Sequence, residues 1–126
     1  MSVTLAQKAL LERLQDMPGR PAMAYPNGPS VTALPRIVAQ NAPTAQRTST
    51  LEGQTEGMAE IVVRVEGEAG GYDAEVNGII ESIVDHFPVG LRTDSVTIVE
   101  APLPRPAIPG TAVYSVPVII RGRFHF

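Results

Sequence analysis

Residue types that could do chemistry are few in this chain of 126 residues, which has no cysteine and two histidines. Without a thiol, a cysteine nucleophile, a disulfide and a thiolate zinc site are all excluded. The histidines, His86 and His125, are separated by a segment rich in expected strands, which leaves little from which to build another metal site. We therefore expect no metal and no cofactor.

Two local patterns resemble catalytic motifs, but simpler explanations fit them better. The run Gly67-Glu68-Ala69-Gly70-Gly71 has the glycines of a phosphate-binding loop. It lacks the Lys-Ser/Thr ending and places a carboxylate where an anion would need donors, so a turn is the better interpretation. Asp85 and His86 are neighbours on an expected helix and do not face each other, so we expect both to be solvent-exposed. No Gly-x-Ser-x-Gly motif is present, and we expect that the chain is not an enzyme.

A proline-rich segment, residues 101–110, is the first candidate contact region. Its four prolines favour an extended, polyproline-like path, which predicts a stiff projecting arm between two strands. Leu103, Arg105 and Ile108 lie among these prolines and are candidate interface residues, because the pattern resembles ligands of small aromatic-grooved domains. A rigid hairpin connection held by its flanking strands is the plainer alternative.

A second candidate contact region is a short basic ribbon near the C-terminal end of the sequence. Arg121, Arg123 and His125 alternate with apolar residues, so they project from one face of an expected strand. A solvated edge that discourages aggregation is one interpretation. Contact with an acidic partner surface, or non-specific attraction to passing DNA, is the other.

Charge is distributed unevenly along the chain. The net charge of −3 argues against a general nucleic-acid binder. Residues 1–50 carry five basic and two acidic side chains. Residues 51–100 carry two basic and eleven acidic side chains, and residues 101–126 carry three basic side chains and no acidic one. Faces of opposite sign are expected, either as a simple solvated acidic surface or as patches for head-to-tail docking of copies.

Two amphipathic helices are predicted by apolar residues recurring at gaps of three and four. The first covers residues 3–17, with Ser2 or Thr4 as its N-cap and Pro18-Gly19 ending it. The second runs from Tyr72 to Phe87 and ends at Pro88.

Alternating apolar residues predict strands at 36–40, 60–66, 95–100 and 111–126, and Pro117 suggests that the last strand is an edge or is bulged. Residues 41–57 have almost no large apolar side chains and are expected to form a mobile loop. The sequence therefore predicts one domain over residues 1–126, of class α+β. We expect an antiparallel or mixed sheet of about four strands, with two amphipathic helices packed on one face. No apolar run approaches the ~20 residues of a membrane span and no signal peptide is recognised, so no membrane partner is expected.

The ordered set of features resembles a family of short phage tail-completion proteins, similar to the tail terminator of lambda-like siphophages and related prophage proteins. The resemblance covers nearly the whole chain, beginning with the N-terminal amphipathic helix. The short motifs that carry it are Ala24-Tyr25-Pro26-Asn27, Glu56-Gly57-Met58-Ala59-Glu60-Ile61-Val62-Val63, Phe87-Pro88-Val89-Gly90 and Val116-Pro117-Val118-Ile119-Ile120.

The resemblance implies a structural virion protein that caps the tail tube as a hexameric ring, ends tail polymerisation and allows head-tail joining. Its partners would be copies of itself, the tail-tube protein and a head-completion or connector protein, with at most non-specific contact with passing DNA. It would be located at the head-proximal end of the tail, and in the host cytoplasm during assembly. Another neck or connector component is the nearest alternative. An adaptor that uses its proline arm, and an unrecognised small enzyme with a deep polar pocket, are alternatives of different classes.

Overall fold

The structure is a computed structural model in which helices and strands alternate irregularly along the chain. It describes residues 2–26, 28, 33–42, 47–49, 55–69, 74–108, 110 and 113–125. The elements in chain order are α1 (Val3–Gln15), β1 (Ala22–Ala24), β2 (Arg36–Asn41), β3 (Arg47–Ser49), β4 (Thr55–Glu68), α2 (Ala74–His86), β5 (Arg92–Thr93), β6 (Val96–Ile98), β7 (Leu103–Pro104) and β8 (Val113–His125).

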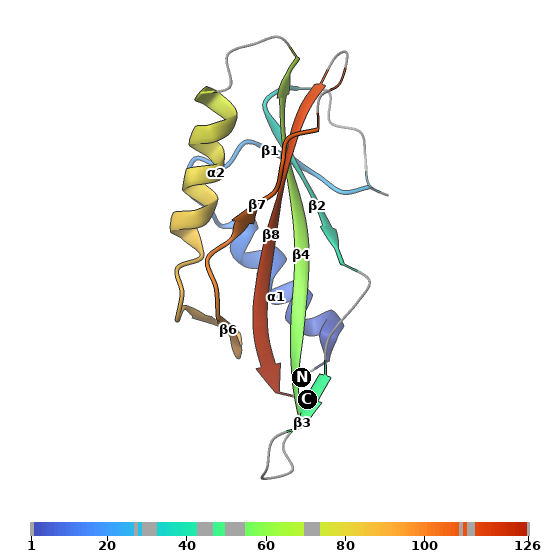
Figure 1. Ribbon diagram of the computed structural model, residues 1–126, viewed down its shortest axis with the longest axis vertical. Coiled ribbons are helices and arrows are strands. Elements are labelled where there is room, and N and C mark those ends of the chain that lie inside the picture. The colour runs from blue at the N-terminus through green and yellow to red at the C-terminus, as the bar shows by residue number, and fades with distance from the viewer. Residues whose placement is uncertain are drawn as a thin grey trace.

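Two long antiparallel strands, β4 and β8, form the centre of the sheet (Figure 1). The continuous strand order is β1-β2-β4-β8-β6-β5, with β3 paired to β4 and β7 paired to β8. Among the strand pairs of the described residues, β1–β2 is parallel and the others are antiparallel, so the sheet is mixed. Both helices lie on one side of it, which confirms the expected α+β class and the helical layer.

The first helix begins and ends close to its predicted bounds. Ser2 is the N-cap, because its hydroxyl accepts a hydrogen bond from the backbone N–H of Leu5 at 3.2 Å. After the helix, Gly19 adopts a φ of 70°, which is easily accessible only to glycine, and the chain turns toward β1. Met17, predicted to be helical, lies beyond the last turn but is still buried.

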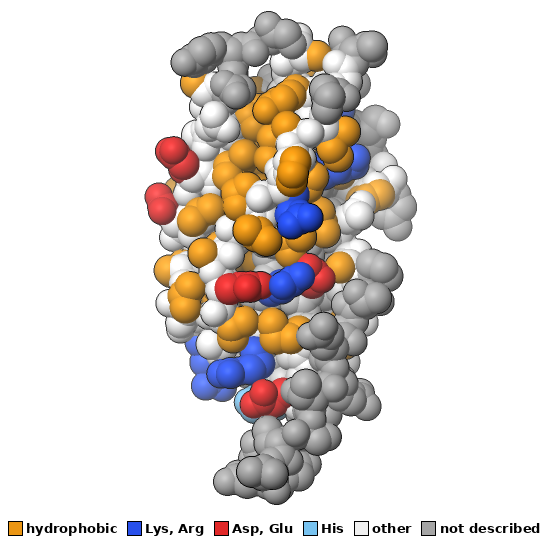
Figure 2. Space-filling model, in the orientation of Figure 1, with side chains coloured by type: hydrophobic (Ala, Val, Ile, Leu, Met, Phe, Trp, Pro, Cys, Tyr) orange, Lys and Arg blue, Asp and Glu red, His pale blue; other side chains and the backbone are white. Residues whose placement is uncertain are grey.

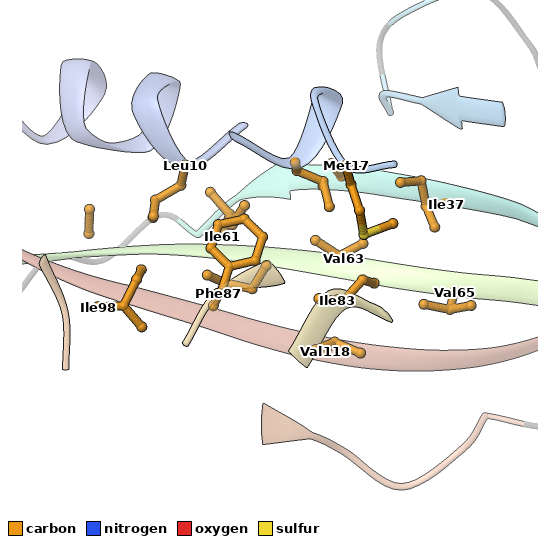
Figure 3. Packing of buried hydrophobic residues seen from close by; sticks show 14 of the residues in the cluster. Leu10, Met17, Ile37, Ile61, Val63, Val65, Ile83, Phe87, Ile98 and Val118 are labelled. Carbon is orange, nitrogen blue, oxygen red and sulfur yellow. The ribbon is translucent and has the colours of Figure 1, made fainter. Parts of the chain in front are cut away.

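One hydrophobic layer lies between the helices and the sheet (Figure 3). Alternate residues of β4 and β8 point into it, so Ile61, Val63 and Val118 are fully buried. Leu10 from α1 and Ile83 from α2 cover them. The predicted apolar stripes of both helices therefore do face a common core.

The expected number of strands, about four, is wrong: the described residues form eight strand segments of one sheet. The missed segments, β1, β3, β5 and β7, have only two or three residues each, too few for a period of two to be visible. The loop expected at residues 41–57 is interrupted, since β3 and the start of β4 pair with each other there. Residues 43–46 and 50–54 of that loop lie outside the described residues.

The proline arm also differs from expectation, because it runs along β8 and does not project. Leu103 pairs with Ile119, the N–H of Arg105 donates to the carbonyl of Pro117 at 2.8 Å, and Ile108 bridges Ser115. This arm and β6 together flank most of β8, so β8 is a central strand and the predicted edge position of Pro117 is wrong.

The position of Pro117 is nevertheless compatible with the ladder. Its carbonyl faces the arm, so its nitrogen faces the arm too, where pairing is short and interrupted. The missing N–H therefore costs the long β4–β8 ladder nothing. By the same alternation, the nitrogens of Pro104 and Pro106 face away from β8, which removes donors from the outer edge and protects it from pairing with another strand.

Gly122 is a position where the side chain of Val96, on the neighbouring strand β6, lies too close to leave room for a side chain. A methyl group there would lie 2.2 Å from Cγ1 of the fully buried Val96. We expect Gly122→Ala to lower the free energy of unfolding by about 1–3 kcal/mol, measured by urea denaturation. Gly78→Ala is the control, because a methyl group there meets nothing within 4 Å and alanine is favoured in a helix. An unchanged midpoint for Gly122→Ala would contradict the close packing.

Candidate assembly surface

The side of the sheet that faces away from α1 and α2 is the candidate contact surface of this fold. Cross-strand partners on this side include Glu60 with Arg121, Val62 with Ile119, and Arg64 with Pro117. Neither helix covers it (Figure 1). We call it the open sheet face; its members are Met58, Glu60, Val62, Arg64 and Glu66 of β4, Ser115, Pro117, Ile119, Arg121, Arg123 and His125 of β8, and Leu103, Arg105 and Ile108 of the arm.

All six interface residues suggested by the sequence lie on this one face. Two separate observations, a proline-rich segment and a basic ribbon, pointed to them. The arm residues and the ribbon residues share this face because the arm aligns antiparallel to β8, which places Leu103 beside Ile119 and Ile108 beside Ser115. Residues directly opposite in an antiparallel pair point to the same side of the sheet.

The upper part of the open sheet face is apolar. Leu103 is 45% exposed and Ile108 is 55% exposed, although both are large aliphatic side chains. Beside them Val62, Pro117 and Ile119 are half-buried. Figure 2 shows hydrophobic side chains continuous across this region, with few charges among them. We call these five residues the apolar zone; a contiguous exposed patch of this kind is typical of a surface that another protein covers.

Ion pairs cross the face below the apolar zone, where Figure 2 shows acidic and basic side chains side by side. Nε of Arg121 lies 3.1 Å from a carboxylate oxygen of Glu60, and its Nη1 lies 3.0 Å from one of Glu100. The hydrogen bond to Glu60, and then the charge of that carboxylate, raise the pKa of Arg121 above its usual range. Arg121 is therefore already paired within the subunit, unlike the solvated ribbon cation that the sequence suggested.

The other two ribbon residues lie further along β8. Arg123 is exposed and lies opposite Met58. Nδ1 of His125 lies 4.0 Å from a carboxylate oxygen of Glu56. The predicted shared face is confirmed by the register, but acidic residues of β4 lie beside two of the three ribbon residues.

Glu66 is a buried carboxylate at the opposite end of the open sheet face. One oxygen accepts a hydrogen bond from Nε of Arg36 at 2.7 Å, and the other accepts one from the Ser115 hydroxyl at 2.8 Å. Burial acts to raise the pKa of Glu66, but these two hydrogen bonds and the charges of Arg36 and Arg64 outweigh it, so the pKa lies below its ordinary value of 4.5. The charged form is the one that the fold stabilises.

We expect Glu66→Gln to destabilise the protein at neutral pH by about 1–3 kcal/mol, since an amide leaves a donor unmatched beside Arg36 and Ser115. The pKa is lower in the folded state than in the unfolded chain, so the carboxylate stabilises the fold above pH 4.5, and this contribution is lost as pH falls through the folded pKa. Urea unfolding between pH 7 and pH 3 should show the difference between the two proteins shrinking with acidity. Glu75→Gln, at an exposed position on α2, controls for loss of a surface carboxylate; a pH-independent difference for Glu66→Gln would contradict the assignment.

His86 is not fully solvent-exposed as predicted, because it connects the two helices. Its Nε2 lies 2.7 Å from the carbonyl oxygen of Arg13, and its own carbonyl accepts two hydrogen bonds from the Arg13 guanidinium. These reciprocal bonds hold the end of α1 against the end of α2. Asp85 is exposed as expected, and His86 has a structural role.

Tyr25 lines two open hollows, each about 400 Å³ in volume. Leu11, Pro26 and Ala39 to Asn41 line the first, and Arg20 is the charged residue lining the second. Among the described residues that line them, neither hollow combines a carboxylate with a basic group that could act beside it. Within the described ranges, no three His, Asp or Glu side chains are grouped as metal ligands. Helices long and apolar enough to cross a membrane are likewise absent from the part of the chain that the structure describes.

Comparison with known proteins finds solved structures of similar fold. No protein-family model matches this chain, and no curated protein matches it either. A solved structure described as "Np_888769.1" has a similar fold, with a TM-score of 0.63 and 21% identity, covering 100% of this chain and 97% of the other.

A second solved structure of similar fold is a chain from the "Virion of native gene transfer agent (GTA) particle". It has a TM-score of 0.67 and 16% identity, and covers 95% of this chain and 94% of that one. This chain therefore shares its fold, over nearly its full length, with a chain of the gene transfer agent virion.

Proposed function

We propose that this chain is a structural component of a phage-like particle and acts by docking to other subunits, with no reactive centre of its own. The fold shared with the gene transfer agent virion chain, over 95% of this chain, is the observation that carries the proposal. The open sheet face supports it, because an uncovered apolar zone on a rigid two-stranded base suits a docking surface. Two of its acidic groups form ion pairs within the subunit, Glu60 with Arg121 and Glu66 with Arg36.

Within the particle, the proposed role is that of a tail terminator, a ring that closes the tube, ends its polymerisation and presents its other surface to the head. The sequence resemblance to tail-completion proteins supports this finer role. The proposed partners are other copies of this chain, the tail-tube protein and the head connector, and its proposed location is the head-proximal end of the tail. The uneven charge along the chain supports the unlike patches that a ring contact requires.

An adaptor role for the proline arm has less support than a structural one. A polyproline ligand binds in an extended form that is free to enter a groove. Here the backbone of Arg105 and Ile108 is hydrogen-bonded to β8, so the arm is part of the sheet.

Deletion of the gene in cells that produce the particle tests the role. For a terminator, electron microscopy should reveal tail tubes of uncontrolled length that are not joined to heads. Restoring the gene on a plasmid should restore tails of uniform length. Tails of normal length together with tailless heads would instead indicate a connector, and normal infectious particles would refute both roles.

A further inference from the structure

Arg64 has an unusual environment at the centre of the open sheet face. It lies opposite Pro117 on β8 and opposite Val38 on β2, so its cross-strand neighbours on both sides are apolar. Its Nε is buried and is without a hydrogen-bond partner among the described residues. A buried unsatisfied donor costs about 1–3 kcal/mol and calls for an explanation.

No nearby carboxylate on the same strand satisfies this group. Glu66 is two residues away and its charge interacts with Arg64, but its oxygens accept from Arg36 and Ser115. Arg121, by contrast, reaches Glu60 and Glu100. Arg64 is half-exposed as a residue, so a carboxylate that approaches from outside the subunit can reach the terminal nitrogens of its guanidinium, while Nε itself stays buried.

The outer face of α2 offers carboxylates in a suitable arrangement. Positions 74, 78, 81 and 85 follow the helical repeat and form one exposed stripe, opposite the buried Val76, Ile80 and Ile83. Glu81 and Asp85 are its charged members, and no ion pair joins either of them to another residue in the described part of the chain. Two like charges four residues apart destabilise a helix unless a cation lies near them.

We infer that the open sheet face of one copy receives the outer face of α2 of a second copy, with Arg64 and Arg105 binding Glu81 and Asp85. This inference rests on the proposed function, in that it names the self-contact of the assembled particle protein. The charges are complementary, and the small Ala74 and Gly78 let the helix approach the sheet closely.

The spacing of the four charged groups is compatible with this contact. Arg64 and Arg105 flank β8 at Pro117, so their backbones are two strand spacings, or about 10 Å, apart. Glu81 and Asp85 are four residues, or about 6 Å, apart along the helix axis. Long arginine side chains cover the difference. Because the two surfaces differ, the contact is heterologous and repeats from copy to copy.

A reciprocal charge exchange tests the contact, using the full-length protein purified and produced in particle-forming cells. The face variant is Arg64→Glu with Arg105→Glu, and the helix variant is Glu81→Arg with Asp85→Arg. Each variant alone places like charges in the contact, and self-association by mass photometry, with and without tail tubes, should weaken by at least about 30-fold. Mixed in equal amounts, every contact between unlike variants is again complementary, so the oligomer and the yield of functional particles should recover.

Circular dichroism and thermal unfolding establish that each variant is folded. If the Arg64→Glu protein does not fold, Arg64→Met replaces it, because methionine has a similar side-chain volume and no charge. Recovery in the mixture supports the contact even if another protein proves to control tail length. The experiment therefore distinguishes failure of the terminator role from failure of the proposed contact. Wild-type association of either folded variant alone would overturn the inference. Particle defects that occur only with the face variant, without recovery on mixing, would overturn it too and would assign the open sheet face to a different virion protein.

Discussion

Replacing Leu103 and Ile108 together with aspartate is expected to leave the protein folded while reducing functional particles by roughly 100-fold or more. The two side chains are 45% and 55% exposed on the arm, so their removal from the apolar zone costs the isolated subunit little. In an assembled interface the same positions would be buried, and a charge without a partner there is strongly unfavourable. Particle titre from complemented deletion cells, with circular dichroism of the purified variant, measures both effects.

Leu5→Asp provides a matched control for the double variant. Leu5 is 52% exposed, but it belongs to α1, on the opposite side of the sheet. An aspartate in the first turn of a helix is also favourable, so the control should fold normally. We expect it to support normal particle yield. Equal yields of functional particles from Leu5→Asp and from the double variant would show that the apolar zone is not part of the interface.

Phe87→Ala is expected to have the largest effect on folding, lowering the free energy of unfolding by about 3–5 kcal/mol. The ring is fully buried just after α2, within the core cluster, and it packs edge-on against the imidazole of His86 with ring centres 5.5 Å apart. A domain of this size has only about 5–15 kcal/mol of stability, so the variant should be marginal at 37 °C. Urea denaturation followed by circular dichroism gives the value.

Val89→Ala is the control for Phe87→Ala, because Val89 is two residues away and 63% exposed. It should change the free energy of unfolding by less than about 0.5 kcal/mol. If the two substitutions cost the same, Phe87 does not close the core as the structure indicates.

The helices were predictable because each has a long apolar stripe that only one periodicity explains. In α2, Val76, Ile80 and Ile83 recur at gaps of three and four and are buried in the structure. The middle of the longest strand was predicted for the same reason, since Ile61, Val63 and Val65 recur at every second position and are buried. Short strands were missed because their formation depends on a neighbour: the two-residue β5 forms only by pairing with β6, across a turn in which Asp94 and Ser95 both have positive φ although neither is glycine.

The candidate site was predictable only in part. Arg121, Arg123 and His125 share a face by simple alternation, and the register confirms it. That Glu60 and Glu100 would reach Arg121 was not predictable, because these carboxylates are 61 and 21 residues away from it along the chain. Arg64 and Glu66 were visible as the polar side of their strand, but the roles of Arg36 and Ser115 depend on two further strands.

The amino-acid sequence by itself determined the two helices, the two long strands and which side of each is apolar, because these follow from periodicities within a dozen neighbouring residues. Only the tertiary structure decided that the proline arm lies along β8 and that the outward side chains of the arm, β4 and β8 share one face. Those arrangements depend on hydrogen bonds and packing between segments far apart in sequence, and they place Arg64 at the centre of the open sheet face.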